Sequence, residues 1–80
     1  MTYHDAEAKI PVNAIFRHFK GNLYEVLAIA KDTETEEPIV IYQDINKHGT
    51  IWARPASMWF DEVIEGVKRF TLSFENQVLV

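Results

Sequence analysis

The spacing of apolar and polar residues predicts a chain that is built mainly from short β-strands. After residue 13, apolar positions tend to repeat every two residues, and turn-forming residues interrupt the pattern. Because successive side chains of a strand point to opposite faces, this period is typical of β structure. The predicted strands cover residues 15–20, 23–30, 39–42, 50–54 and 68–75.

The segment 23–30 is the strongest of the predicted strands, and both of its faces are apolar. A strand of this kind is covered on both sides or curls through a barrel. Strict alternation places Tyr24, Val26, Ala28 and Ala30 on one face, and Leu23, Leu27 and Ile29 on the other.

These patterns predict a mainly β fold, a small SH3-like barrel of about five antiparallel strands. One short helix or helical turn is expected near residues 57–65, where the pairs Trp59/Val63 and Phe60/Ile64 are each four residues apart. The polar loop 32–38 joins two strong strands and predicts an antiparallel hairpin. An open sheet packed by the short helix is the alternative architecture.

The chain is expected to form a single domain with an N-terminal arm. Residues 1–13 show no steady period, and Pro11 prevents a long helix there, so we interpret them as an arm that is ordered only where something docks against it. Residues 14–80 form the β-rich domain. The end, Gln77-Val78-Leu79-Val80, is apolar and is expected to pair with the domain's own sheet or with a second copy in a homodimer.

Composition and charge exclude several classes of function. The 80 residues include no cysteine, so disulfides, thiolate catalysis and thiolate metal sites are excluded. The net charge of −4 argues against a sequence-independent grip on nucleic acid. There is no run of apolar residues long enough to span a membrane. The first residues include the acidic Asp5 and Glu7 and so do not resemble a signal peptide, and we therefore expect a cytoplasmic protein.

Three blocks of residues resemble a known family. They are similar, in this order, to small bacterial proteins of domain of unknown function family 1653. The resemblance runs from Phe16 to Val63, with a looser match at Arg69-Phe70. The blocks are His18-Phe19-Lys20-Gly21-Asn22-Leu23-Tyr24-Glu25-Val26; then Ala30, Thr33-Glu34-Thr35, Glu37-Pro38 and Tyr42; then Trp52-Ala53-Arg54-Pro55 and Met58.

The resemblance implies a compact, largely β domain of bacterial origin, and it implies no activity because the family is uncharacterised. One departure concerns the first hairpin loop. Members of the family often carry glycine where this chain has Glu36, so the loop is expected to turn differently here.

His18 and Glu25 are the candidates for acid–base chemistry. A neutral imidazole serves as a general base or a metal ligand, but His4 and His48 do not lie at metal-ligand spacing from His18. We therefore expect a structural or partner contact for His18, and neither a metal site nor a cofactor. Glu25 lies inside a strand, where an ion pair with Arg17, Lys20 or Arg54 is the favoured interpretation.

Trp52 and Arg54 are the candidates for recognition. Arginine binds carboxylate or phosphate through planar pairs of hydrogen bonds, and tryptophan offers a flat face for stacking. The favoured interpretation is nevertheless that Trp52 fills the core and Arg54 pairs with Glu25 or Asp61, and surface recognition is the alternative. Tyr42 and Trp59 would enlarge an aromatic patch around Trp52.

Three functions of different classes follow from these residues. The favoured one is a non-enzymatic module that binds a protein or peptide, with His18, Lys20, Tyr42, Trp52, Arg54 and Trp59 as candidate binding residues. The first alternative is a nucleic-acid-binding barrel with a local basic patch. The second is a small enzyme or ligand-binding domain centred on His18 and Glu25. The basic patch would use Arg17, His18, Lys20, Lys47, Arg54, Lys68 and Arg69.

Overall fold

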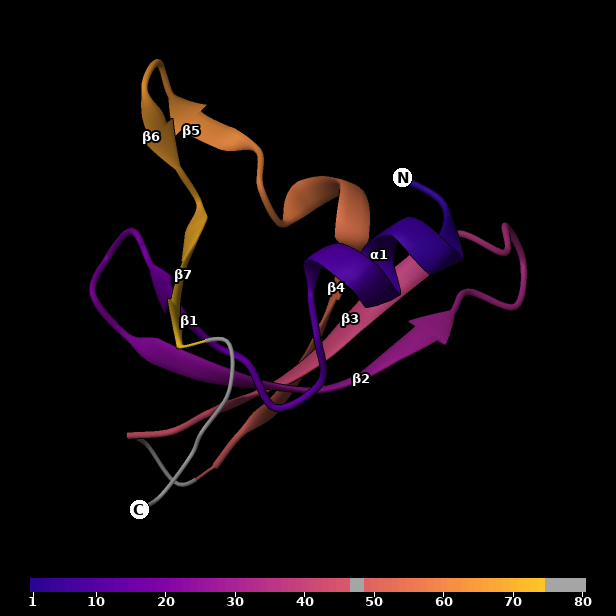
Figure 1. Ribbon diagram of the computed structural model, residues 1–80, viewed down its shortest axis with the longest axis horizontal. Coiled ribbons are helices and arrows are strands. Elements are labelled where there is room, and N and C mark those ends of the chain that lie inside the picture. Colours follow the sequence, from indigo (N-terminus) through magenta and orange to yellow (C-terminus); the bar gives the residue numbers. More distant parts are fainter. Residues whose placement is uncertain (47–48, 75–80) are drawn as a thin grey trace.

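Seven strands, one α-helix and one 3₁₀-helix make up the part of the chain that the computed structural model describes, residues 1–46 and 49–74 (Figure 1). The last residues, including the apolar Gln77-Val78-Leu79-Val80 expected to pair with a sheet, lie outside the described residues. The elements are α1 (Tyr3–Lys9), β1 (Ile15–His18), β2 (Leu23–Lys31), β3 (Pro38–Asp44), β4 (Ile51–Pro55), η1 (Ala56–Met58), β5 (Glu62–Ile64), β6 (Val67–Lys68) and β7 (Phe70–Phe74).

The main sheet has five antiparallel strands in the order β4-β3-β2-β1-β7. In a flat sheet, β4 and β7 would lie about 19 Å apart, because neighbouring strands are spaced by about 4.8 Å. The guanidinium carbon of Arg54 on β4 nevertheless lies 5.9 Å from the ring centre of Phe70 on β7. The sheet therefore curls strongly, and the predicted mainly β, barrel-like fold of about five antiparallel strands is confirmed.

A β-bulge in β2 changes which residues face the core. The pairing register with β3 passes from Val26↔Tyr42 directly to Ala28↔Ile41, which leaves Leu27 as the extra residue. The face assignment by strict alternation is therefore wrong beyond Val26. Ile29 is buried and Ala28 is exposed, because the inserted residue moves every later side chain to the opposite face.

The predicted helical turn near 57–65 is shorter than expected. It consists of η1, and residues Glu62–Ile64 form strand β5 of a separate hairpin with β6. In Figure 1 this hairpin projects away from the main sheet. The apolar residues Trp59 and Ile64 therefore do not share one helical face: Trp59 enters the core, whereas Ile64 is exposed on the hairpin.

Helix α1 lies within the N-terminal arm and packs against β2. The side chains of Thr2 and Asp5 form a reciprocal capping box that begins the helix. Ala6 and Ile10 are fully buried, and the hydroxyl of Tyr3 donates a hydrogen bond to the carbonyl of Ile29. The arm is thus docked over the same face of the sheet as η1 (Figure 1).

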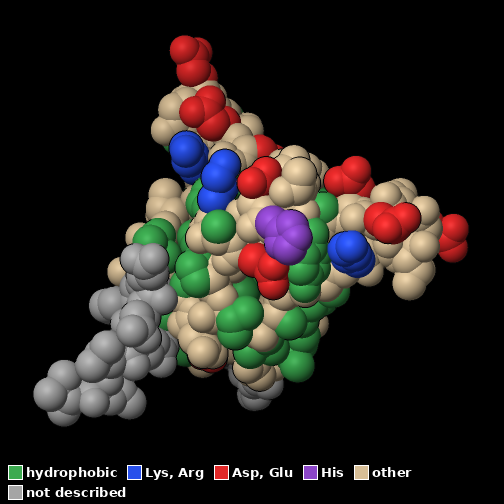
Figure 2. Space-filling model, turned by 45° about the vertical axis from the view of Figure 1, so that its right-hand side comes forward, with side chains coloured by type: hydrophobic (Ala, Val, Ile, Leu, Met, Phe, Trp, Pro, Cys, Tyr) green, Lys and Arg blue, Asp and Glu red, His purple; other side chains and the backbone are tan. Residues whose placement is uncertain are grey.

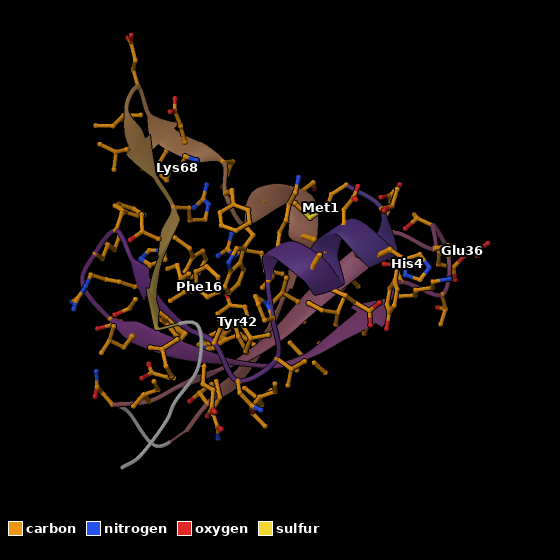
Figure 3. The ribbon with its side chains drawn as sticks, in the orientation of Figure 1. Met1, His4, Phe16, Glu36, Tyr42 and Lys68 are labelled. Carbon is orange, nitrogen blue, oxygen red and sulfur yellow. The ribbon has the colours of Figure 1, made fainter. Side chains whose placement is uncertain are left out.

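The core lies between the concave face of the sheet and the layer formed by α1 and η1. Phe16 and Tyr42 point into this space in Figure 3, and Trp59 enters it directly after η1. Acidic side chains gather at projecting ends of the molecule (Figure 2). Within the described residues, no helix is long and apolar enough to cross a membrane.

Candidate functional site

A cavity of about 170 Å³ opens on the concave face of the sheet. Every one of the five strands of the main sheet contributes at least one residue to its wall, so the cavity exists only because the sheet curls. The lining residues are His18 of β1, Tyr24 of β2, Tyr42 of β3, Trp52 and Arg54 of β4, and Phe70 of β7.

Strand register explains why these side chains converge. His18 pairs with Phe70, and Tyr42 pairs with Trp52. Directly opposite residues of antiparallel strands project from the same face of the sheet. Tyr24 lies before the bulge in β2, so it keeps the same face as Val26.

Edge-to-face aromatic contacts form the wall and floor of the cavity. The ring of Phe70 lies 5.0 Å from His18, 5.9 Å from Tyr24 and 5.7 Å from Tyr42. Phe70 is in turn stacked on Trp59, with ring centres 3.9 Å apart and planes within 5° of parallel. Because Phe70, Tyr42 and the underlying Trp59 are buried, the packing of the core holds this part of the cavity in place.

Arg54 supplies a partly buried positive charge inside the aromatic wall. Its Nε donates a hydrogen bond of 3.3 Å to the hydroxyl oxygen of Tyr42, and its guanidinium lies over the Phe70 ring. Among the described residues, no acceptor is bound to its Nη1 or Nη2. Arg54 therefore holds four N–H donors that the fold does not use.

His18 is a neutral donor at the cavity wall. Burial lowers the pKa of His18 below its usual 6.5, and the charges of Arg54, Arg69 and Lys20 lower it further. Its Nδ1 accepts a hydrogen bond from the backbone N–H of Lys20 at 3.2 Å. The neutral ring consequently carries its proton on Nε2, which makes that nitrogen a donor.

Asp61 interacts electrostatically with Arg54, but its carboxylate is already bound by Arg69. Arg69 donates to Oδ1 at 2.9 Å and to Oδ2 at 3.1 Å. This hydrogen bonding lowers the pKa of Asp61, and the charge of Arg54 contributes to the same shift. Both carboxylate oxygens of Asp61 are thus engaged by Arg69, and the expected ion pair of Arg54 with Glu25 or Asp61 is not formed. The interpretation of Trp52 as a core residue is also wrong, because its side chain is half exposed.

Four of the six candidate binding residues line the cavity: His18, Tyr42, Trp52 and Arg54. Trp59 lies beneath it, fully buried, and Lys20 is exposed outside it. Two further residues that were not among the sequence-predicted candidates also line the cavity, Tyr24 and Phe70. Tyr24 lies within the first block that resembles the known family and Phe70 within the looser match at Arg69-Phe70, and this was the available signal for them.

An acid–base site that combines His18 with Glu25 is not formed in this fold. His18 shares the cavity with Tyr24, whereas Glu25 follows Tyr24 in β2 and so projects from the opposite face. In the described part of the chain, no group of three or more His, Asp or Glu residues could hold a metal ion.

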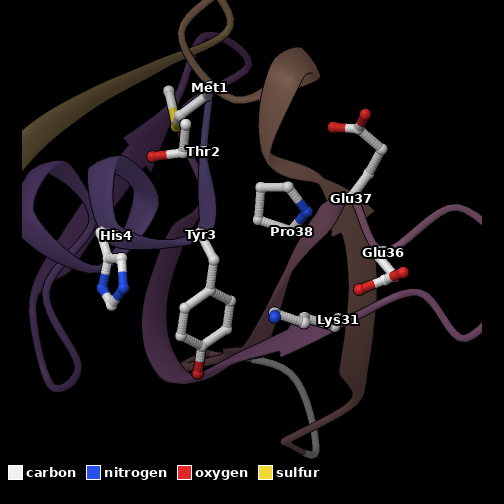
Figure 4. Close-up of a pocket in the computed structure, with 8 residues that line it drawn as sticks. All are labelled: Met1, Thr2, Tyr3, His4, Lys31, Glu36, Glu37 and Pro38. Carbon is white, nitrogen blue, oxygen red and sulfur yellow. The ribbon is translucent and has the colours of Figure 1, made fainter.

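A second, larger hollow of about 570 Å³ lies between the N-terminal residues and the β2–β3 hairpin (Figure 4). Two of its polar groups are engaged: Lys31 Nζ lies 5.4 Å from the Tyr3 ring centre, and the Tyr3 hydroxyl bonds the backbone of β2. Its lining mixes cationic and anionic side chains that are mostly exposed. We therefore regard the Arg54 cavity as the better candidate site.

Comparison with known proteins identifies the family of the chain. No curated protein and no solved structure matches the chain. A family model described as "Protein of unknown function (DUF1653)" matches residues 14–72. All residues that line the Arg54 cavity fall inside this range, and so do Lys31, Glu36, Glu37 and Pro38 of the larger hollow. The match covers most of the sequence, and the chain belongs to the DUF1653 family of proteins of unknown function.

Proposed function

We propose that this protein is a non-enzymatic module that binds an extended peptide segment of a protein partner along strand β4. The observation that carries the proposal is the convergence of His18, Tyr42, Trp52 and Arg54 on one preformed cavity beside an edge strand. A bacterial, cytoplasmic setting, as expected from the sequence, is part of the same proposal.

Strand β4 has the properties of a peptide-pairing edge. It is a terminal strand of the main sheet in the described part of the chain, so one of its sides presents backbone groups with no neighbouring strand. Ile51 and Trp52 are 59% and 51% exposed, although both are large apolar residues. An added strand supplies affinity through main-chain hydrogen bonds, and adjacent pockets supply specificity.

The nucleic-acid alternative has less support from the geometry. Arg54, Arg69 and Lys20 are each close enough to His18 to lower its pKa, but Arg69 is already paired with Asp61. Arg17 follows Phe16 in β1 and projects from the opposite face to His18. The described residues of the expected basic patch therefore lie on both faces of the sheet. The net charge of −4 also remains unfavourable for binding nucleic acid.

Selection of peptides tests the proposal. The full chain would be immobilised and used to select from a displayed library of random peptides, and the affinities of the enriched peptides would be measured by calorimetry. Trp52→Ala is expected to weaken binding at least tenfold, because a half-exposed aromatic anchor is removed. Ile64→Ala is the matched control, since it removes an exposed apolar residue from the projecting hairpin.

The backbone amide signals of β4 in NMR spectra should shift when a selected peptide is added. Circular dichroism would verify that both variants keep the native fold. Peptides that bind Trp52→Ala as tightly as the natural chain, or a selection that enriches no sequence at all, would rule out this function.

A further inference from the structure

We infer that the Arg54 cavity recognises the carboxylate of an acidic side chain in the bound peptide, held by the free guanidinium nitrogens and the surrounding hydroxyl and imidazole donors. This inference rests on the proposed function and specifies its ligand. It follows from three features of the cavity: its donors, its charge and its position beside β4.

The polar groups that line the cavity have more donors to offer a ligand than acceptors. Arg54 has unused N–H groups on Nη1 and Nη2, and neutral His18 has its N–H on Nε2. The hydroxyl oxygens of Tyr42 and Tyr24 accept hydrogen bonds from Arg54 and Asn22, so the proton of each hydroxyl remains available. A group that accepts several hydrogen bonds, such as a carboxylate, is the complement of this lining.

The charge of the cavity indicates a single negative charge on the ligand. Arg54 is the one cationic residue in the lining, and no carboxylate of a described residue pairs with it. A partly buried cation gains free energy from an anionic partner. A dianionic phosphate is usually bound by a cluster of arginines, and the net charge of −4 opposes it further. A methylated or free ammonium group is excluded from the aromatic wall because Arg54 already occupies the Phe70 face.

The position of the cavity indicates a side chain and not a chain terminus. Trp52 and Arg54 alternate along β4, so both project onto the concave face. A peptide paired with β4 continues as a strand past the cavity, about 4.8 Å from β4, and directs alternate side chains to that same face. A volume of about 170 Å³ is suited to one such side chain.

Small carboxylates test this inference without a known partner. N-acetylglutamate amide and its neutral counterpart N-acetylglutamine amide would be titrated into the full chain, and NMR would follow the indole N–H of Trp52 and the Nε–H of Arg54. The glutamate compound is expected to shift both signals and to bind at least tenfold more tightly than the glutamine compound. Arg54→Gln should abolish this preference, because charge-assisted hydrogen bonds are lost.

Arg17→Gln is the matched control. It removes the same charge from the same sheet, but Arg17 is exposed and projects away from the cavity. It should leave the affinity for the glutamate compound unchanged within twofold. Equal affinities for the glutamate and glutamine compounds, or equal losses in the Arg17 and Arg54 variants, would overturn the inference.

Two further binding measurements test the competing classes of ligand. N-acetylphenylalanine carries a terminal carboxylate, and tighter binding of this compound than of N-acetylglutamate amide would overturn the side-chain assignment. A single-stranded oligonucleotide that binds at low salt, loses affinity steeply as salt is raised and depends on Arg54 would overturn it in favour of nucleic acid.

The selected peptides separate this inference from the function on which it rests. Enrichment of acidic residues, with loss of binding in Arg54→Gln, supports both. Peptides that require Trp52 but are not acidic and bind Arg54→Gln normally would overturn the carboxylate and leave the peptide-binding function intact. Failure to select any Trp52-dependent peptide would overturn the function itself.

Discussion

The two tryptophans illustrate different uses of the same side chain, one in the core and one beside the Arg54 cavity. Trp59 is fully buried, stacked on Phe70 at 3.9 Å and packed edge-to-face with Phe16 and Tyr42. Trp52 is 51% exposed at the mouth of the cavity. Phe70 belongs to both regions, because one side of its ring contacts Trp59 and the ring also lines the cavity. The core thus positions the surface that we propose for binding.

The indole nitrogen of Trp59 emphasises the difference. It is buried and has no hydrogen-bond partner among the described residues. Its packing, and not a polar contact, therefore holds Trp59 in place, at a desolvation cost that such groups incur. At the mouth of the cavity, unused donors are close to solvent and available to a ligand.

The largest effect is expected from Trp59→Ala. Removing a fully buried aromatic residue costs about 3–5 kcal/mol of the free energy of unfolding. A domain of this length has roughly 4–12 kcal/mol in total, so this single change should remove from about a quarter to all of the free energy of unfolding. Thermal and urea unfolding followed by circular dichroism would measure the loss. A variant as stable as the natural chain would show that the stack with Phe70 is not part of the core.

Trp52→Ala should separate stability from binding. Because half of the side chain is already exposed, the free energy of unfolding should fall by only about 1 kcal/mol. Urea unfolding under the conditions used for Trp59→Ala gives the direct comparison. A loss equal to that of Trp59→Ala would mean that Trp52 is a core residue and would remove the contrast between the two regions.

Glu36→Gly tests whether stability can be raised away from the cavity. Glu36 has a φ of +62°, in the left-handed region that favours glycine. This agrees with the glycine that the family resemblance leads us to expect at this position. The substitution should increase the free energy of unfolding by about 0.5–1 kcal/mol through relief of this strain.

The affinity for selected peptides should be unchanged in Glu36→Gly, because Glu36 borders the larger hollow and not the Arg54 cavity. Calorimetry with the same peptide compares the two chains. A drop in affinity would couple the hairpin loop to the cavity, which the geometry does not predict.

The smallest effect is expected from the titration of His18. Burial lowers the pKa of His18 in the folded state, so between that pKa and about 6.5 the unfolded chain binds more protons than the folded one. The contribution of neutral His18 to the free energy of unfolding is therefore fully present above pH 6.5, and it is lost as the pH falls through the folded-state pKa. Urea unfolding at a series of pH values would detect it.

His18→Gln should flatten that part of the pH dependence. Carboxylate binding should respond in the opposite direction. Protonation of His18 adds a positive charge to the cavity wall, so the affinity for N-acetylglutamate amide should rise over the same interval.

The sequence alone predicted much of the fold because local alternation and turn residues act over short distances. The strands around Ile15, Leu23, Ile39, Ile51 and Phe70 were all predicted, and so was the hairpin through the loop 32–38. The bulge at Leu27 was not predicted, because an extra residue has no signature within the strand and is fixed only by pairing with β3.

The segment 57–65 is a region where the prediction of a helix from the sequence was largely wrong. Its apolar spacing fits a helix, but the turn ends at Met58 and the chain continues into β5. Long-range contacts outweigh local spacing here, because Trp59 is drawn into the stack with Phe70, and Asp61 is held by Arg69.

The candidate site divides in the same way. The chemistry of the residue types was enough to identify four lining residues from the sequence alone, namely Trp52, Arg54, Tyr42 and His18. Only the tertiary structure decided that Trp59 is core, that Glu25 faces away from His18, and that Tyr24 and Phe70 complete the cavity. The physical reason is that the cavity spans five strands from Arg54 on one edge to Phe70 on the other, and only the curl of the whole sheet brings these edges together.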